Sequence, residues 1–125
     1  MTKRILVIDD DEDILNIIEI VLNDEGYQVI ASRSGNIIDE VLRIRPNLIL
    51  LDERLAGTKG HELCKLLKTE RPTSSIPVVM ISAATGLKQI AINCIADNYI
   101  EKPFDISVLC EVVASTLAKA TSQTV

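Results

Sequence analysis

The chain has 125 residues, of which 47% are hydrophobic and 25% are charged, and its net charge is −5. This length fits one domain, and the composition is that of a globular protein with enough apolar material for a core. Two tyrosines and one phenylalanine are its only aromatic residues, and it has no basic patch, which argues against direct binding to nucleic acid. No apolar run reaches the length of a membrane span and no secretory signal is apparent, so we expect a cytoplasmic protein away from membranes.

The first half of the chain alternates short apolar runs with amphipathic stretches. Residues 5–8 form an apolar run bounded by charged residues, which predicts a strand buried on both faces; residues 27–31 and 48–51 predict two more. Gly26 ends the first predicted helix and Pro46 follows the second. The apolar side chains that mark these two helices are Ile14, Ile17, Ile18, Val21 and Leu22, then Ile37, Ile38, Val41 and Leu42.

The second half continues the alternation. A loop with Gly57 and Gly60 leads into a third helix, and residues 78–81 and 99–100 predict two further strands. The side chains that we expect on the inner faces of the last three helices are Leu63, Leu66 and Leu67, then Leu87, Ile90, Ala91, Cys94 and Ile95, then Leu109, Val112, Val113 and Leu117.

Five strand–helix units in strict alternation predict an α/β fold. Such units form a doubly wound (βα)5 structure, in which right-handed crossovers place helices on both faces of a five-stranded parallel sheet. We expect one domain over residues 1–120, followed by a polar tail or linker start at 121–125.

We do not expect the three cysteines or the single histidine to form a functional site. Cys64, Cys94 and Cys110 are widely spaced and form no C-x-x-C pair, so we expect reduced, buried small side chains rather than a metal or redox site. His61 is the only histidine, and we expect an exposed residue in the first turn of a helix.

The chemistry is predicted at the strand ends. Ligands of an open parallel sheet gather at the carboxyl edge of its strands. The first strand leads to Asp9 and Asp10, the third to Asp52, the fourth to Ser82 and the fifth to Lys102. Clustered carboxylates need a compensating cation, and such oxygen ligands suit Mg²⁺; a carboxylate also serves as a nucleophile for a phosphoryl group.

Each of these residues also has a simpler explanation. Asp9 and Asp10 could cap the following helix, as we expect Asp11 and its acidic neighbours to do. Ser82 could be a small polar residue at a strand end, and Lys102 a surface lysine. The convergence of all of them on one edge favours a site that handles phosphoryl groups.

Four motifs in order give the sequence a family resemblance over residues 3 to about 119. They are I-L-V-I-D-D-D-E-D at 5–13, N-L-I-L-L-D at 47–52, V-V-M-I-S-A at 78–83 and N-Y-I-E-K-P-F at 98–104. The chain resembles the receiver domain of bacterial two-component response regulators. The resemblance implies a flavodoxin-like sheet with strand order 2-1-3-4-5, and a phosphoprotein switch rather than a turnover enzyme.

The resemblance also implies a role for each matching residue. Asp52 would be the phosphoacceptor, and Lys102 would contact the phosphoryl group and precede a cis peptide bond to Pro103. Ser82 would move toward the phosphoryl group on activation while Tyr99 turns inward. Mg²⁺ would be held by Asp9, Asp10, Asp52 and the backbone carbonyl of Arg54.

Two positions implied by the resemblance would tune the lifetime of the phosphoryl group. Side chains two positions after the acceptor and two after the hydroxyl residue flank the path of the attacking water; these are Arg54 and Ala84. The chain also departs from the family pattern, because Glu53 follows the acceptor where apolar residues are common. The 20 positions from Ser82 to Lys102 (102 − 82) are few for the family, which predicts a short fourth helix.

The implied partners are a sensor histidine kinase or a phosphotransfer protein, and an unidentified output; a phosphorylation-dependent dimer is left open. Two alternatives also stay open. One is a small phosphatase similar to the haloacid dehalogenase superfamily, with Asp9 as nucleophile and Asp11 as acid, although Asp13 and the missing cap argue against it. The other is a receiver-like binding module that works without phosphorylation.

Overall fold

The computed structural model describes residues 2–32, 37–55 and 57–122. Strands and helices alternate along the chain as β1 (Arg4–Ile8), α1 (Glu12–Asp24), β2 (Gln28–Ser32), α2 (Ile37–Ile44), β3 (Leu48–Leu51), β4 (Arg54–Leu55), β5 (Thr58–Lys59), α3 (Gly60–Thr69), β6 (Val78–Ser82), α4 (Leu87–Asn93), β7 (Asn98–Glu101) and α5 (Ile106–Ser122).

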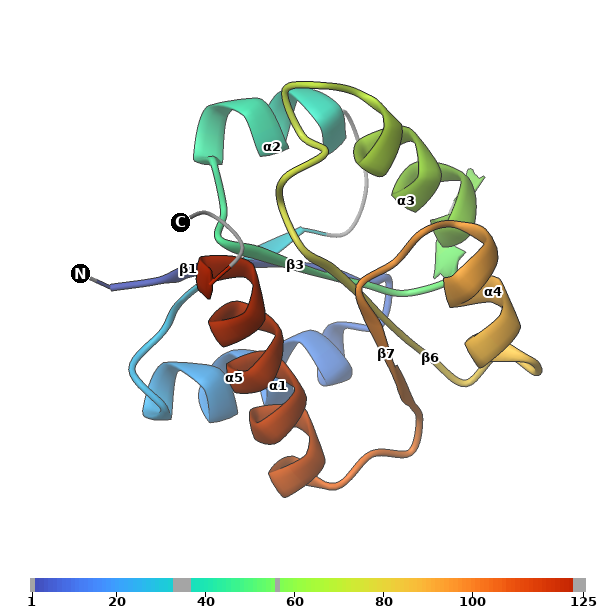
Figure 1. Ribbon diagram of the computed structural model, residues 1–125. Helices are drawn as coiled ribbons and strands as arrows, with labels where there is room; N and C mark the ends of the chain where they lie inside the picture. Colours follow the sequence, from blue (N-terminus) through green and yellow to red (C-terminus); the bar gives the residue numbers. More distant parts are fainter. Residues whose placement is uncertain (1, 33–36, 56, 123–125) are drawn as a thin grey trace.

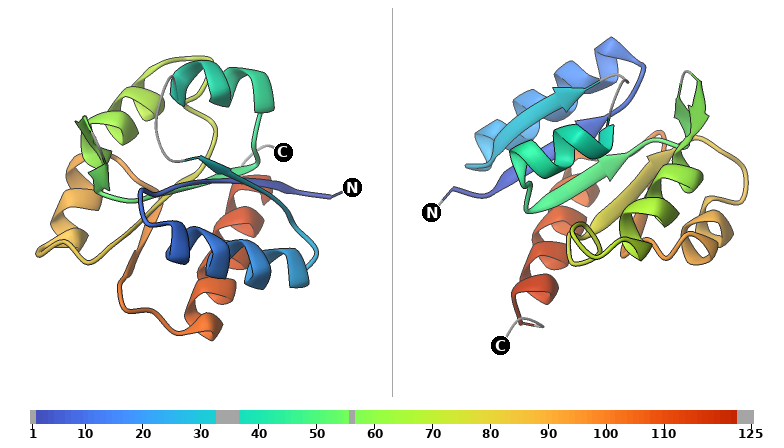
Figure 2. Two further views of the ribbon diagram at one scale, coloured as in Figure 1. Left: turned by 180° about the vertical axis from the view of Figure 1, so that it is seen from behind. Right: turned by 90° about the horizontal axis from the view of Figure 1, so that it is seen from above.

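The main sheet has five parallel strands in the order β2-β1-β3-β6-β7. Counted along the main sheet alone, this is the predicted order 2-1-3-4-5, because β4 and β5 form a separate small hairpin. The strands lie side by side through the centre of the molecule (Figure 1), and the view from above shows the hairpin beyond the end of β3 (Figure 2). The predicted fold class is therefore confirmed.

Both faces of this sheet are covered, which explains why its central strands are apolar at every position except Arg4, which begins β1, and Ser82, which ends β6. In β1, Ile5 and Val7 pack toward α1 and α5, whereas Leu6 and Ile8 pack toward α2, α3 and α4. Figure 1 shows these two groups of helices on opposite sides of the sheet. Strands of this kind carry no polar alternation, since neither face meets water.

Helix α1 begins at a side-chain cap. Asp11 accepts hydrogen bonds from the backbone N–H groups of Asp13, at 3.0 Å, and Ile14, at 3.3 Å. Glu12 and Asp13 lie in the first turn, where negative charge is favoured by the helix dipole. The predicted capping role of these acids agrees with this geometry.

Four predicted inner positions are wrong. Leu42 is 39% exposed, because Ile44 takes the buried position near the end of α2. Ile17 is 45% exposed, because Leu15 occupies the inner face of α1 beside Ile18. Leu66 is 44% exposed, because Cys64 takes the buried position of α3. Ile95 is 52% exposed, since it lies past the end of α4 in a left-handed backbone conformation, with φ of 65°.

Several boundaries differ from the sequence prediction in smaller ways. The loop after β3 contains the β4–β5 hairpin, which turns through Gly57 with a positive φ of 81°. Helix α4 has only seven residues, as the short spacing before Lys102 predicts. Helix α5 continues through Ser122, two residues into the predicted tail, and residues 123–125 lie outside the described part of the chain.

Within the described residues, no helix has the length and hydropathy to cross a membrane.

Candidate functional site

Strand register brings the predicted site residues to one edge. Ile8 pairs with Leu51, so the next residues, Asp9 and Asp52, leave neighbouring strands side by side. Backbone bonds continue past the ladder, because the N–H of Asp52 donates to the carbonyl of Ile8 at 3.0 Å. At the other side of the edge, the N–H of Lys102 donates to the carbonyl of Ser82 at 2.9 Å.

A single ammonium group joins the two carboxylates. Lys102 Nζ lies 2.7 Å from Asp9 Oδ2 and 3.3 Å from Asp52 Oδ2. Asp9 is 1% exposed and Asp52 is 7% exposed, so this contact is shielded from water. Salt screens such a pair little, and its attraction exceeds that of a surface ion pair.

Asp9 is nevertheless poorly compensated. Burial raises the pKa of its carboxyl group above the ordinary value, and the negative charge of Asp52 raises it further. The hydrogen bond from Lys102 and the N–H of Asp11, which donates to Asp9 Oδ1 at 2.9 Å, act in the opposite direction. The balance shows that one lysine does not fully offset two buried carboxylates, and further positive charge would be favoured there.

The other acids of the first loop lie differently. Asp10 is exposed beside this pair, whereas the side chain of Asp11 is used as the cap of α1. An acid that caps a helix is poorly placed to protonate a leaving group at Asp9. The geometry therefore disfavours the phosphatase alternative.

The donor set fits Mg²⁺ better than a metal held entirely by protein. Over the described residues, no three His, Cys, Asp or Glu side chains form a closed metal-binding group. Mg²⁺ keeps several waters and needs only one or two carboxylates, which Asp9 and Asp52 can supply. Their incomplete charge compensation is the observation that favours a divalent cation.

Ser82 and Tyr99 lie on the neighbouring strands. Ser82 is 1% exposed, and its Oγ accepts a hydrogen bond from the N–H of Ala84 at 3.3 Å. Tyr99 is half-buried and packs against the apolar cluster under α4. The peptide bond between Lys102 and Pro103 is cis.

A hollow of about 420 Å³ opens beside Asp52, between the hairpin and the loop after β6. Arg54 and Ala84, the two positions proposed to tune the phosphoryl lifetime, both line it, as do Lys59 and Thr85. Arg54 is exposed, and its backbone N–H donates to Asp52 Oδ1 at 3.4 Å. Both residues thus border the same hollow, which Glu53, the residue after the acceptor, also lines.

Glu53, next to the acceptor, binds His61, a contact that was not predicted from the sequence. Glu53 is 8% exposed, and its carboxylate accepts a hydrogen bond from the N–H of His61 at 2.7 Å, while His61 Nδ1 lies 2.6 Å from the other oxygen. His61 therefore lies in the first turn of α3 as predicted, but its ring is bound rather than free. The departure at Glu53 from the expected apolar residue was the available signal.

Gly60 lies beside this contact between Glu53 and His61 and packs against the backbone of the acceptor. Its N–H donates to the carbonyl of Glu53 at 2.8 Å, and a Cβ at this position would overlap the backbone carbonyl of Asp52. Only glycine lets α3 begin so close to the acceptor.

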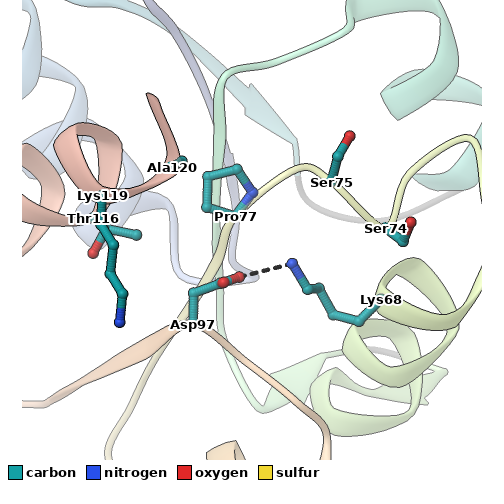
Figure 3. Close-up of a pocket in the computed structure, with 8 residues that line it drawn as sticks. All are labelled: Lys68, Ser74, Ser75, Pro77, Asp97, Thr116, Lys119 and Ala120. Atoms are coloured by element: carbon teal, nitrogen blue, oxygen red, sulfur yellow. Dashed lines mark hydrogen bonds and ion pairs between the residues drawn. The ribbon is translucent and has the colours of Figure 1, made fainter. Parts of the chain in front are cut away.

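A cavity of about 370 Å³ lies at the opposite, amino edge of the strands (Figure 3). Lys68 and Asp97 form an ion pair there at 2.8 Å. Lys68 also donates to the carbonyl of Ile76 at 3.0 Å, and Asp97 accepts from the N–H of Val78 at 2.8 Å. These bonds brace the start of β6, so the pair has a structural role.

Comparisons with known proteins agree with this geometry. Residues 5–114 match the family model described as the response regulator receiver domain. The chain is 36% identical over 107 residues to the DNA-binding response regulator MtrA of Mycobacterium tuberculosis, a match that covers 83% of this chain and 46% of the relative. The chain thus spans less than half the length of these relatives.

Solved structures give the same result. A CheY-like response regulator receiver domain protein from Methanospirillum hungatei has 29% identity and a TM-score of 0.89, with 98% of this chain and 99% of that chain covered. NtrX from Brucella abortus has 32% identity and a TM-score of 0.85, with 99% of this chain but 29% of that chain covered.

The charge balance at Asp9 predicts a pH-dependent change in stability. Because the folded state raises the pKa of Asp9, protonated Asp9 favours folding; this contribution is full below the unfolded pKa and is lost as pH rises through the folded pKa. In EDTA at pH 7, we expect Asp9→Asn to raise Tm by roughly 4 °C, the shift that about 1 kcal/mol produces in a domain of this size. Thermal unfolding followed by circular dichroism measures it.

The exposed neighbour supplies the control. Asp10→Asn removes the same charge and should change Tm much less. The advantage of Asp9→Asn should shrink as pH falls through the raised pKa of Asp9 in the folded state, and it should be gone below about 4, near the unfolded pKa. A lower Tm for Asp9→Asn at pH 7 would contradict the assignment.

Proposed function

The chain belongs to the family of response regulator receiver domains, and we propose that it takes a phosphoryl group onto Asp52 from a sensor histidine kinase or a phosphotransfer protein. The observation that supports this proposal is the buried Asp52 carboxylate, which shares the Lys102 ammonium with Asp9 at the carboxyl edge of the sheet. We assign it as a cytoplasmic signalling domain rather than a turnover enzyme.

The proposed transfer needs little acid–base chemistry. A carboxylate oxygen of Asp52 attacks phosphorus, the new O–P bond forms as the N–P bond of the phosphohistidine breaks, and the imidazole leaves. Lys102 is placed to pair with a phosphoryl oxygen, because its ammonium already contacts Asp52. Such transfers depend on positioning and on charge compensation.

Receiver domains of this family generally bind Mg²⁺ at the phosphorylation site. In this chain Asp9, Asp10, Asp52 and the backbone carbonyl of Arg54 would hold it. Bound there, the ion supplies the positive charge that the carboxylates and the phosphoryl oxygens require. Two buried carboxylates that share one ammonium support this assignment, and the pKa of Asp9, which burial raises, agrees with it.

Signalling would follow from a shift in the loop after β6. The Ser82 hydroxyl now accepts a bond from the N–H of Ala84, and it would donate a hydrogen bond to a phosphoryl oxygen after a small movement. Tyr99, half-buried beside α4, would turn inward with it. Phosphorylation then biases an equilibrium between two packings of α4, β7 and α5.

The output of the signal lies outside this fold. MtrA is described as a DNA-binding response regulator, and the match covers less than half of it. The sequence shows no basic patch of the kind that binds nucleic acid, so we assign the output to a further domain or a separate partner.

Asp52→Asn should abolish phosphorylation by acetyl phosphate in Mg²⁺, because an amide cannot attack phosphorus. Intact-mass measurement of the phosphorylated fraction checks this, and Asp105→Asn, at an exposed position before α5, is the matched control. EDTA should slow the wild-type reaction. Full labelling of Asp52→Asn together with loss of label in Asp9→Asn would overturn the assignment in favour of a phosphatase-like nucleophile.

The phosphoryl group should be comparatively long-lived. Ala84 offers no group to orient a water, and Arg54 is bulky and cannot act as a base. Arg54→Asn with Ala84→Glu should speed the loss of the phosphoryl group several-fold, measured by mass spectrometry after the donor is removed. Lys88→Glu, exposed on α4, should decay like the wild type. Equal decay in the double variant and the wild type would refute the role of these two positions.

A further inference from the structure

Two of the three cysteines meet in the fold although they lie thirty residues apart in the sequence. Cys64 is on the inner face of α3, and Cys94 follows α4 directly. The Cys64 thiol donates to the carbonyl oxygen of Cys94 at 3.4 Å, and the Cys94 thiol donates to the carbonyl oxygen of Ala91 at 3.6 Å. Both residues are almost fully buried, at 0% and 2% exposure, and both are free thiols.

The pair is not sealed in the core. A groove of about 510 Å³ runs between α3 and α4, which pack side by side in Figure 1. Cys94 lines this groove together with His61, Lys65 and Asn93, whereas Cys64 does not. A small reagent in the groove therefore meets Cys94 before it meets Cys64.

Cys94, the thiol at the groove, is the more acidic of the two. The neighbouring side chain of Cys64 lowers the pKa of Cys94 to about 7, although burial acts against it. The neighbouring side chain of Cys94, together with burial, raises the pKa of Cys64. The thiolate is the reactive form of cysteine, so the sulfur at the groove is also the better nucleophile.

We propose that Cys94 and Cys64 form a reversible redox pair that reacts with small hydroperoxides through the groove between α3 and α4. The Cys94 thiolate attacks a peroxide oxygen and the O–O bond breaks, which gives a sulfenic acid on Cys94 and releases water or an alcohol. The Cys64 thiol then attacks the sulfenic sulfur, the S–O bond breaks, and a second water leaves. Two thiols are oxidised to one disulfide by two electrons, and the peroxide is reduced.

The resulting bond would join α3 to the end of α4. The Cys64 sulfur already lies 3.4 Å from the carbonyl oxygen of Cys94, and the bond requires the two sulfurs to approach to the S–S distance of about 2.05 Å. The reaction does not depend on phosphorylation of Asp52, and its outcome is independent of the proposed function. In a reducing compartment such a pair is transient, as expected of a sensing disulfide.

Cys110 provides the internal control. It lies on α5, on the other side of the sheet, and is half-buried. Burial raises the pKa of its thiol, and the negative charge of Glu25 adds to this effect. Cys110 should therefore react with peroxide more slowly than Cys94.

The test treats the reduced, folded chain with equimolar hydrogen peroxide, then unfolds it and blocks free thiols with N-ethylmaleimide. Intact mass and peptide mapping should show the loss of two of the three alkylatable thiols and a peptide linked through Cys64 and Cys94. Dithiothreitol should restore all three. Cys110→Ser, which leaves the pair intact, should form the same link.

Two variants test the order of the steps. Cys64→Ser should stop at the sulfenic acid on Cys94, which dimedone traps, and Cys94→Ser should leave Cys64 alkylatable. The proposal is overturned if Cys64 and Cys94 both stay alkylatable in wild type and in Cys110→Ser. It is equally overturned if Cys110 is oxidised first. The wild-type and Cys110→Ser results decide the question even where a variant of the pair is unstable.

Discussion

The site depends on one ammonium group that holds two buried carboxylates together. Without Lys102, Asp9 and Asp52 would leave adjacent strands as two uncompensated negative charges, both shielded from water. The raised pKa of Asp9 shows that the compensation is partial. Such a site favours a divalent cation, and a bound cation would in turn compensate the negative charge of a phosphoryl group on Asp52.

Strand pairing brings Asp9, Asp52 and Lys102 to the same edge of the sheet. The pairing of Ile8 with Leu51 places the two carboxylates side by side, and the pairing of Ser82 with Glu101 brings Lys102 to the same edge. Behind the acceptor, Glu53 and Gly60 fix the start of α3 against the backbone of Asp52.

The sequence predicts the sheet well, since central strands buried on both faces are apolar throughout and the helices between them are strongly periodic. It predicts inner and outer positions less well where two apolar residues compete. Leu66 and Cys64 both fit a helical stripe, and only packing decides that the smaller side chain is buried. The contacts of Glu53 with His61 and of Cys64 with Cys94 depend on how α3 docks on its neighbours, which no local pattern encodes.

The most direct test of this account is a carboxyl ¹³C NMR titration of Asp9 in the metal-free wild type and in Lys102→Met. We expect Asp9 to titrate above the ordinary aspartate range in the wild type, because burial and Asp52 outweigh Lys102, and we expect its pKa to rise further when the ammonium is removed. An Asp9 pKa in the ordinary range, or one that Lys102→Met leaves unchanged, would contradict the central role of the shared lysine.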